Sequence, residues 1–316
     1  MAQLANVKNV TKTVSNLFPR VNRTHFIESS LEHSWSDVYL PINNVDTDNF
    51  CEFRIPRSQG NLIDLSSLNL QFHFTVKKKI ESAGIWSPFQ KTSSGDHFEI
   101  SNAIAFSLFK HLTIEFNGVQ VTNESNYSLL SYIRLLTQFP VEEINKLGRL
   151  FHLEHYNKIL QNISSDTYFT NLPTNSSVSK RLLSLRDNGV FVRAPLMTDI
   201  CNINSYLLDN IDITIRLSLH EGSSIFITSQ QQPDISSPNP KKYNYDISNI
   251  SLHVKKVKPS DNAYTALQKT LIPKLNDIPT LDYIFTSKVT KQFHLPSGQN
   301  GKYIFIVNLF YIFMYI

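Results

Sequence analysis

The chain has 316 residues, a formal net charge of +4 and only nine glycines. This length suits two ordinary domains or one large all-β unit. The low glycine count, with no GxGxxG or phosphate-loop motif, argues against a nucleotide-binding enzyme, and the mild positive charge permits an anionic partner without requiring one.

The chain contains two cysteines, Cys51 and Cys201. They cannot form a disulfide framework and lie in no C-x-x-C motif, so synthesis in a reducing intracellular compartment is expected. Residues 1–18 are polar and lack the apolar core of a signal peptide. The sequence therefore predicts an intracellular protein that is not secreted.

The first segment, residues 1–32, is predicted to be a flexible N-terminal arm. It is polar, shows no sustained period and is interrupted by Pro19. Two short strands are predicted after it, at 34–41 and 49–55, where apolar and polar residues alternate.

The clearest strand pattern lies at residues 65–77, where apolar and polar residues alternate strictly from Leu68 onward. Such a period places all apolar side chains on one face, as in a half-buried strand of an antiparallel sheet. The pattern returns at 112–121, 211–220 and 250–254, so the predicted fold class is an all-β antiparallel sandwich. Its inward positions are predicted to be Leu68, Leu70, Phe72, Phe74, Val76, Ile211, Ile213 and Ile215.

A tight hairpin is predicted after an irregular loop at residues 80–100. Alternating residues lead into Asn117-Gly118 and continue beyond it. Asn-Gly supplies the two positive φ values that a type I′ turn requires, so the two flanking strands should pair directly.

A short helical insertion is predicted next, at about 124–150. Asn123 is the expected cap of its first helix, and Pro140 is the expected first residue of its second. The predicted buried stripe of the first helix consists of Leu129, Ile133 and Leu136.

Residues 230–242 form the best linker in the sequence, since they contain three prolines and few apolar residues. A domain boundary is predicted there. The first jelly-roll sandwich would span 33–229, and residues 243–316 would form part of a second.

Within the second part, a strand at 247–258, a helix at 261–271 and strands near 283–295 are predicted. Residues 303–316 contain thirteen apolar residues and one Asn. Fourteen residues are too few to span a bilayer as a helix. This tail is either a buried strand or a gene-model artefact that continues past an exon end.

No catalytic, cofactor-binding or metal site is predicted. His152 and His155 lack nearby further ligands and are interpreted as a solvated helix end. Glu142 and Glu143 are adjacent and cannot face one another across a substrate on a helix. Cys201 has no recognisable His partner motif and is interpreted as a small buried apolar group.

Basic residues cluster at 77–79, 241–242 and 255–258. Lysines at strand ends protect sheet edges from mispairing, and this interpretation is favoured. Contact with nucleic acid is the alternative, although no aromatic residues are interleaved as in single-strand-binding proteins.

Seven short segments, taken together and in their order along the chain, carry a resemblance to a known family. They are residues 37–42 (DVYLPI), 51–55 (CEFRI), 62–65 (LIDL), 107–109 (SLF), 116–122 (FNGVQVT), 207–213 (LLDNIDI) and 253–257 (HVKKV). Between about 34 and 295, this collinear set resembles the major capsid, or hexon, protein of Polinton (Maverick) elements and adintoviruses.

The resemblance implies a double jelly roll whose homotrimers build the capsid lattice of an icosahedral DNA virus, without catalysis or cofactors. It also implies a penton or minor capsid protein as a partner, location in the virion when the element is expressed, and no membrane. That family's second jelly roll continues well past residue 303, so here it would be incomplete. Asp209-Asn210 stands where an Asn-Gly turn is usual.

Two other functions stay open. A cellular jelly-roll module that binds carbohydrate or protein would need exposed aromatic side chains on one face, whereas most aromatic residues here occupy inward positions of the alternation. An enzyme built on a β-sandwich would need a convergent polar cluster, which the sequence does not reveal.

Overall fold

The computed structural model of the chain describes a subset of its residues. They are 31–58, 60–80, 85–88, 98–101, 103–140, 189–202, 206–208, 211–228, 243–265, 280–283, 288–289, 306–307 and 312–315. Residues 1–30 of the predicted arm at 1–32, the predicted second helix after Pro140 and the linker at 230–242 lie outside the described residues. Residues 31–32 begin the first strand, so the arm boundary predicted at residue 32 falls inside a strand.

Eight of the described strands form one long antiparallel hairpin of nested pairs. The first strand pairs with the eighth, the second with the seventh, the third with the sixth, and the fourth with the fifth. The pairs are β1 (Leu31–Tyr39) with β12 (Tyr243–Pro259), β2 (Phe50–Ile55) with β10 (Ile213–Leu219), β3 (Leu62–Ile80) with β8 (Val190–Pro195), and β6 (Phe109–Phe116) with β7 (Val119–Glu124).

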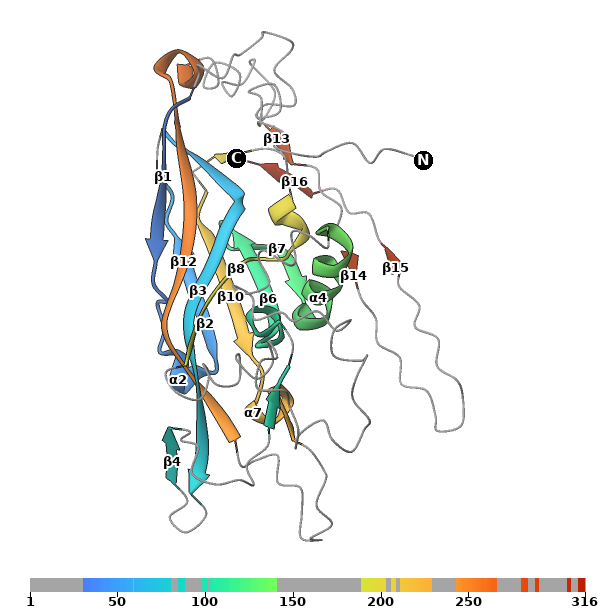
Figure 1. Cartoon of the computed structure of the whole chain (residues 1–316). Coiled ribbons are helices and arrows are strands. Elements are labelled where there is room, and N and C mark those ends of the chain that lie inside the picture. Colours follow the sequence, from blue (N-terminus) through green and yellow to red (C-terminus); the bar gives the residue numbers. More distant parts are fainter. Residues whose placement is uncertain are drawn as a thin grey trace.

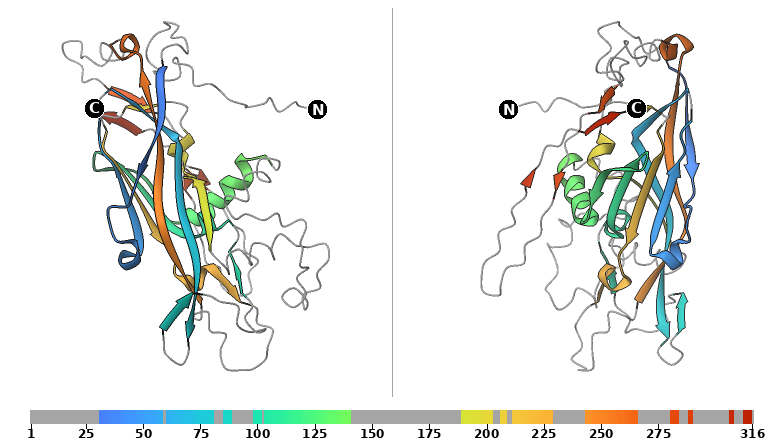
Figure 2. Two further views of the ribbon diagram at one scale, coloured as in Figure 1. Left: turned by 60° about the vertical axis from the view of Figure 1, so that its left-hand side comes forward. Right: turned by 180° about the vertical axis from the view of Figure 1, so that it is seen from behind.

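Two further pairings roll this hairpin into a sandwich. β12 also pairs with β3, and β10 also pairs with β6, so the eight strands divide into the sheets β1-β12-β3-β8 and β2-β10-β6-β7. Figures 1 and 2 show the two sheets face to face. Two four-stranded antiparallel sheets connected in this way are a jelly roll, which confirms the predicted fold class.

The core lies between the two sheets, as the alternation predicted. All eight predicted inward residues are at most 3% exposed, whereas their polar neighbours, such as Gln71 and Thr214, are not buried. A one-residue slip of either strand would exchange these two sets, so the buried face fixes the register.

Phe72 tests the importance of this core. Its ring is fully buried and meets Phe109 of the opposite sheet edge to face, with centroids 5.9 Å apart. Phe72→Ala should lower the free energy of unfolding by about 3–5 kcal/mol, because it leaves a cavity between the sheets. Urea unfolding followed by circular dichroism measures this loss. The control is Gln71→Ala on the outer face, and equal losses for both variants would contradict the assignment of faces.

The strand predicted to open a second sandwich belongs to the first. β12 runs between β1 and β3 over 17 residues, and its Leu252 and Val254 are fully buried in the core. The boundary predicted at 230–242 is therefore wrong for this strand. The physical reason is that the first strand and the central strand of this sheet both need β12 as their hydrogen-bonding partner.

The predicted hairpin is confirmed. Asn117 and Gly118 have φ values of 50° and 78°, and they connect β6 directly to β7. These two positive values are those of a type I′ turn.

The first predicted helix exists, but its cap and its buried face differ from the prediction. α4 (Tyr127–Gln138) begins after Asn126, whereas Asn123 lies within β7. Leu129 and Leu136 are about half exposed. The buried side chains of the helix are instead Tyr127, Leu130, Ser131, Arg134 and Leu135.

Short elements complete the described part of the chain. Three of them lie near the ends of the core strands: α2 (Val45–Asp48), β4 (Ile85–Pro88) and α7 (Gly222–Ile225). β4 falls within a segment that was predicted to be a loop. The others are β5 (Phe98–Ile100), α3 (Ile104–Ser107), η3 (Asp199–Asn202), β9 (Leu207–Leu208) and β11 (Phe226–Thr228).

After β12 the chain continues into a helix, of which residues 261–265 are described, and into two small sheets. The tail pairs with earlier residues, since β16 (Ile312–Tyr315) pairs with β13 (Thr280–Tyr283). Likewise, β15 (Ile306–Val307) pairs with β14 (Lys288–Val289). The strand alternative for residues 303–316 therefore agrees with these pairings.

Candidate functional site

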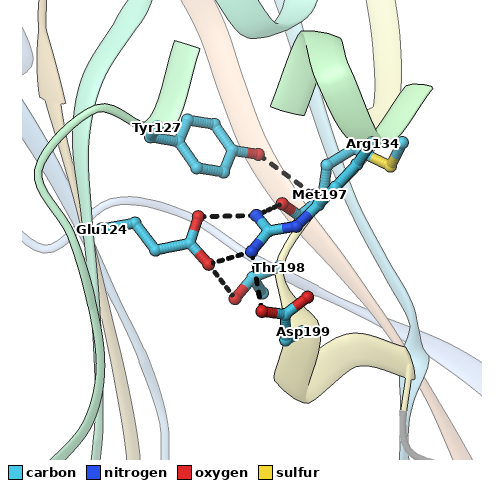
Figure 3. A network of polar contacts seen from close by, with 6 residues as sticks. All are labelled: Glu124, Tyr127, Arg134, Met197, Thr198 and Asp199. Atoms are coloured by element: carbon cyan, nitrogen blue, oxygen red, sulfur yellow. Dashed lines mark hydrogen bonds and ion pairs between the residues drawn. The ribbon is translucent and has the colours of Figure 1, made fainter. Parts of the chain in front are cut away.

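A buried cluster of charged side chains holds α4 against the sandwich (Figure 3). Arg134 donates from Nη1 to Glu124 Oε2 at 2.8 Å and from Nη2 to Glu124 Oε1 at 2.9 Å. Nη2 also lies 2.9 Å from Asp199 Oδ2. Thr198 donates its hydroxyl to Glu124 Oε1 at 2.9 Å. We call these four residues the Arg134 clamp.

The clamp connects two places that are far apart in the sequence. Glu124 ends β7 and Arg134 lies on α4, whereas Asp199 begins the 3₁₀ turn after β8. Arg134 Nη1 also donates to the Met197 carbonyl at 2.6 Å, and the Met197 N–H donates to the Tyr127 hydroxyl at 3.1 Å. The clamp therefore holds together the start of the β7–β8 connection and the segment that follows β8.

Burial dominates the electrostatics of the clamp. The Arg134 side chain is 1% exposed, and those of Glu124 and Asp199 are 6% and 8% exposed. Burial raises the pKa of Glu124, and its hydrogen bonds to Arg134 offset this only in part. Burial lowers the pKa of Arg134, but the two carboxylates outweigh that effect and leave the pKa raised. The guanidinium thus stays charged between two acidic partners.

This arrangement is suited to holding the structure together rather than to chemistry. The neighbouring Cys201 is buried in the core, and burial raises the pKa of its thiol, which keeps it protonated and poorly nucleophilic. This burial agrees with the interpretation of Cys201 as a small core residue. His152, His155, Glu142 and Glu143 lie outside the described residues.

The sequence did carry a signal for the clamp. Arg134 is the one charged residue in the α4 segment YSLLSYIRLLTQ. A single charge in an otherwise apolar helix, if buried, requires partners that compensate it. Those partners come from residues 10 and 65 positions away in the sequence, so the pattern alone could not identify them.

The surface offers a second candidate site at an edge of the larger sheet. In the described part of the chain, β1 pairs on one side only, with β12. Val38 on β1 is 55% exposed, and Leu40 and Ile42, which follow it, are 68% and 62% exposed. A strand edge with apolar side chains is a surface on which another polypeptide can pair and pack. We call β1 and residues 40–42 the β1 edge.

The lysine clusters are largely neutralised where the structure describes them. Lys77 lies 3.0 Å from Asp246, and Lys258 lies 3.0 Å from Glu32. Lys256 is buried against Tyr39 and lies 3.1 Å from Asp37, so it is not the solvated edge charge that the sequence suggested. These pairs weaken the case for a continuous basic surface on β12.

The described residues lack two further features, a metal-binding cluster and a membrane-spanning helix. Among them, no group of three or more His, Cys, Asp or Glu side chains is arranged to hold a metal ion. Likewise, none of their helices is both long enough and apolar enough to cross a membrane.

Comparison with known proteins gives matches at the level of structure alone. No model of a known protein family matches the chain, and no curated protein matches it by sequence. A chain in the 3.5 Å cryo-EM structure of the Sputnik virophage matches with a TM-score of 0.52 and 15% identity, over 86% of this chain and 55% of that one.

Two further solved structures are weaker matches. The Faustovirus major capsid protein aligns over 79% of this chain and 58% of its own, with 11% identity and a TM-score of 0.46. The mavirus major capsid protein aligns over 92% and 56%, with 16% identity and a TM-score of 0.40. The fold comparison therefore rests on the Sputnik chain. The present chain spans about half of the length of that Sputnik chain.

Proposed function

We propose that this protein is a non-enzymatic structural protein of a viral shell, of the major capsid type found in Polinton-like elements. The observation that carries the proposal is the nested eight-strand jelly roll, in the fold shared with a chain of the Sputnik virophage structure. The collinear sequence segments from 37 to 257 support it independently. Neither observation depends on the other, since identity to the Sputnik chain is only 15%.

The mechanism we propose is geometric. The sandwich is a rigid block whose sheets are fixed in register by a buried core, and the β1 edge gives it a surface for neighbouring subunits. In the proposed assembly, this jelly roll is the first of two in the subunit, and three subunits form a pseudo-hexagonal capsomer. A virion location and a penton or minor capsid partner follow from the same proposal.

The division of the chain follows the strand order rather than the linker. We propose that the first jelly roll ends with β12 and that the second begins after it, with residues 230–242 as an internal connection. The small sheets β13·β16 and β14·β15 would then belong to the second roll.

Oligomeric state tests the proposal. A version of the chain extended to the length of the family should form a trimer, because two similar lobes per subunit approximate a hexagon when three subunits meet. Multi-angle light scattering at increasing protein concentration measures the mass. A folded chain that stays monomeric at high concentration would count against the shell function.

Surface variants show whether the β1 edge takes part in this assembly. Val38→Lys places a charge on the edge. Val119→Lys is the control, because Val119 is also exposed and lies at the start of β7, next to the hairpin turn. We expect Val38→Lys alone to shift the mass toward monomer. Loss of assembly in Val119→Lys alone would place the contact elsewhere.

A further inference from the structure

One end of the jelly roll contains a cleft. α2, β4 and α7 lie together at the lower end in Figure 1, in the connections β1–β2, β3–β6 and β10–β12. The cleft between them has a volume of about 460 Å³, within the range of small-molecule sites. Its lining residues are Val45, Asn49, Lys77, Trp86, Leu219, His220, Glu221, Gly222, Asn244, Tyr245, Asp246 and Ile247.

The lining combines an aromatic surface with planar polar groups. Trp86 of β4 is 38% exposed, which leaves part of its indole accessible to a ligand. Asn49 and Asn244 line the cleft with amide groups, and His220 lines it with an imidazole. Nε2 of His220 lies 3.3 Å from the Ser128 hydroxyl, so the ring nitrogen left for a ligand is Nδ1. An accessible aromatic face together with amide and imidazole groups suits a ligand that has both C–H surface and several hydroxyl groups.

Several of these side chains are held in place before any ligand arrives. Tyr245 stacks on Phe74 of the core and donates its hydroxyl to the His220 carbonyl. Asn244 Oδ1 accepts the N–H of Tyr245 at 2.9 Å. A Cβ at Gly222 would lie 2.6 Å from the same oxygen, so the backbone there approaches Asn244 more closely than any other residue type allows. Preorganised groups lose little entropy on binding.

The charges of the lining favour an uncharged ligand. Lys77 and Asp246 form an ion pair 3.0 Å apart and cancel one another. Burial and the nearby Lys110 lower the pKa of His220, so its imidazole is neutral at pH 7. The lining charge that is left is Glu221, which disfavours phosphate and carboxylate ligands.

We propose that this cleft binds a neutral saccharide, whose ring packs on Trp86 and whose hydroxyl groups pair with Asn244, His220 and Asn49. The inference does not depend on the shell function. A chain that binds sugar but does not form trimers would support the saccharide site without the shell function. A chain that forms trimers but binds no sugar would support the shell function without the saccharide site. A neutral sugar on a surface end of the fold is a ligand that either a shell or a cellular protein could recognise.

Tryptophan fluorescence tests the proposal, because the full chain contains only Trp35 and Trp86. Trp35 is equally exposed, at 37%. It pairs with Lys256, about ten residues along β12 from Asp246 in the cleft, roughly 30 Å away. Trp35→Phe leaves a reporter in the cleft, and Trp86→Phe leaves a matched reporter outside it. Circular dichroism checks that both variants stay folded.

The probes are the methyl glycosides of glucose, galactose, mannose and N-acetylglucosamine, with N-acetylneuraminic acid as the anionic comparison. In Trp35→Phe we expect a saturable change in emission with at least one neutral glycoside and none with the acid. Trp86→Phe should show no change, and Trp86→Ala should weaken binding about tenfold by calorimetry. No saturable change with any neutral glycoside, an equal change in both variants, or preference for the acid would overturn the proposal.

Discussion

A chain that ends at Ser229 should fail to form the sandwich, because it lacks β12. This strand bonds to β1 on one side and to β3 on the other, so its loss removes the only described neighbour of β1. It also uncovers the core, in which Leu252 and Val254 are fully buried. Both the unpaired backbone groups and the exposed apolar face oppose folding. The domain boundary suggested by composition implied the opposite result, a soluble and cooperative domain.

The matched comparison is a chain that ends at residue 265, just after β12. We expect this longer chain to unfold cooperatively on heating, and the shorter one to accumulate in the insoluble fraction with no thermal transition. Circular dichroism and the soluble fraction after expression report the two outcomes. A cooperative transition in the chain that ends at Ser229 would mean that the eight strands are not one folding unit.

Alternation predicted the strands and their faces because it is a local property. The contrast between Leu70 and Gln71 depends only on the two-residue period of a strand and on one buried face. The Asn117-Gly118 turn is local in the same way, since two residues determine the backbone geometry. Features of this kind can be identified without knowledge of which strand lies beside which.

Pairing is not local, and the domain boundary was wrong for that reason. Leu31 pairs with Pro259, which is 228 positions away, and nothing in either segment indicates the other. A proline-rich stretch marks a connection, but the same composition serves a connection within one jelly roll and a linker between two. The nested strand order decides between them, because the last strand must return to pair with the first.

The buried face of α4 was misassigned because both faces of this helix carry apolar residues. Leu129 and Leu136 have helical spacing but face outward, whereas Leu130 and Leu135 face the core. Arg134 lies on the buried side, where a charge is unexpected unless partners surround it. Trp86 and its strand β4 were not predicted either, because the residues around Trp86 lack the two-residue period of a strand.

Loss of Arg134 should be among the most destabilising single changes in the chain. Arg134→Ala removes the cation that lies between the buried carboxylates of Glu124 and Asp199. Breaking a buried ion pair by removing one partner costs about 3–5 kcal/mol, since the charge that remains is neither solvated nor compensated. Urea unfolding at pH 7 measures the loss. A change below about 1 kcal/mol would mean that the clamp contributes little to stability.

The pH dependence distinguishes this electrostatic effect from lost packing. Because burial raises the pKa of Glu124, the folded chain holds its proton more tightly than the unfolded chain. The contribution of Glu124 to the free energy of unfolding is therefore greatest at low pH. It falls as the pH rises from the ordinary pKa of a carboxyl group through the raised pKa of Glu124. Tyr127 and Cys201, whose pKa values burial also raises, stay protonated throughout that range.

Arg134→Ala should steepen this fall, because Glu124 then loses the cation that favours its charged form. The double variant Arg134→Ala, Glu124→Gln should lose the added slope and recover part of the stability at pH 7, since it removes one of the two uncompensated charges. Unfolding measured at several values between pH 4 and 8 checks both expectations. If Arg134→Ala were equally destabilised at every pH and the double variant recovered nothing, the role of Arg134 would be packing of its side chain, and the carboxylates would not need it as a counter-ion.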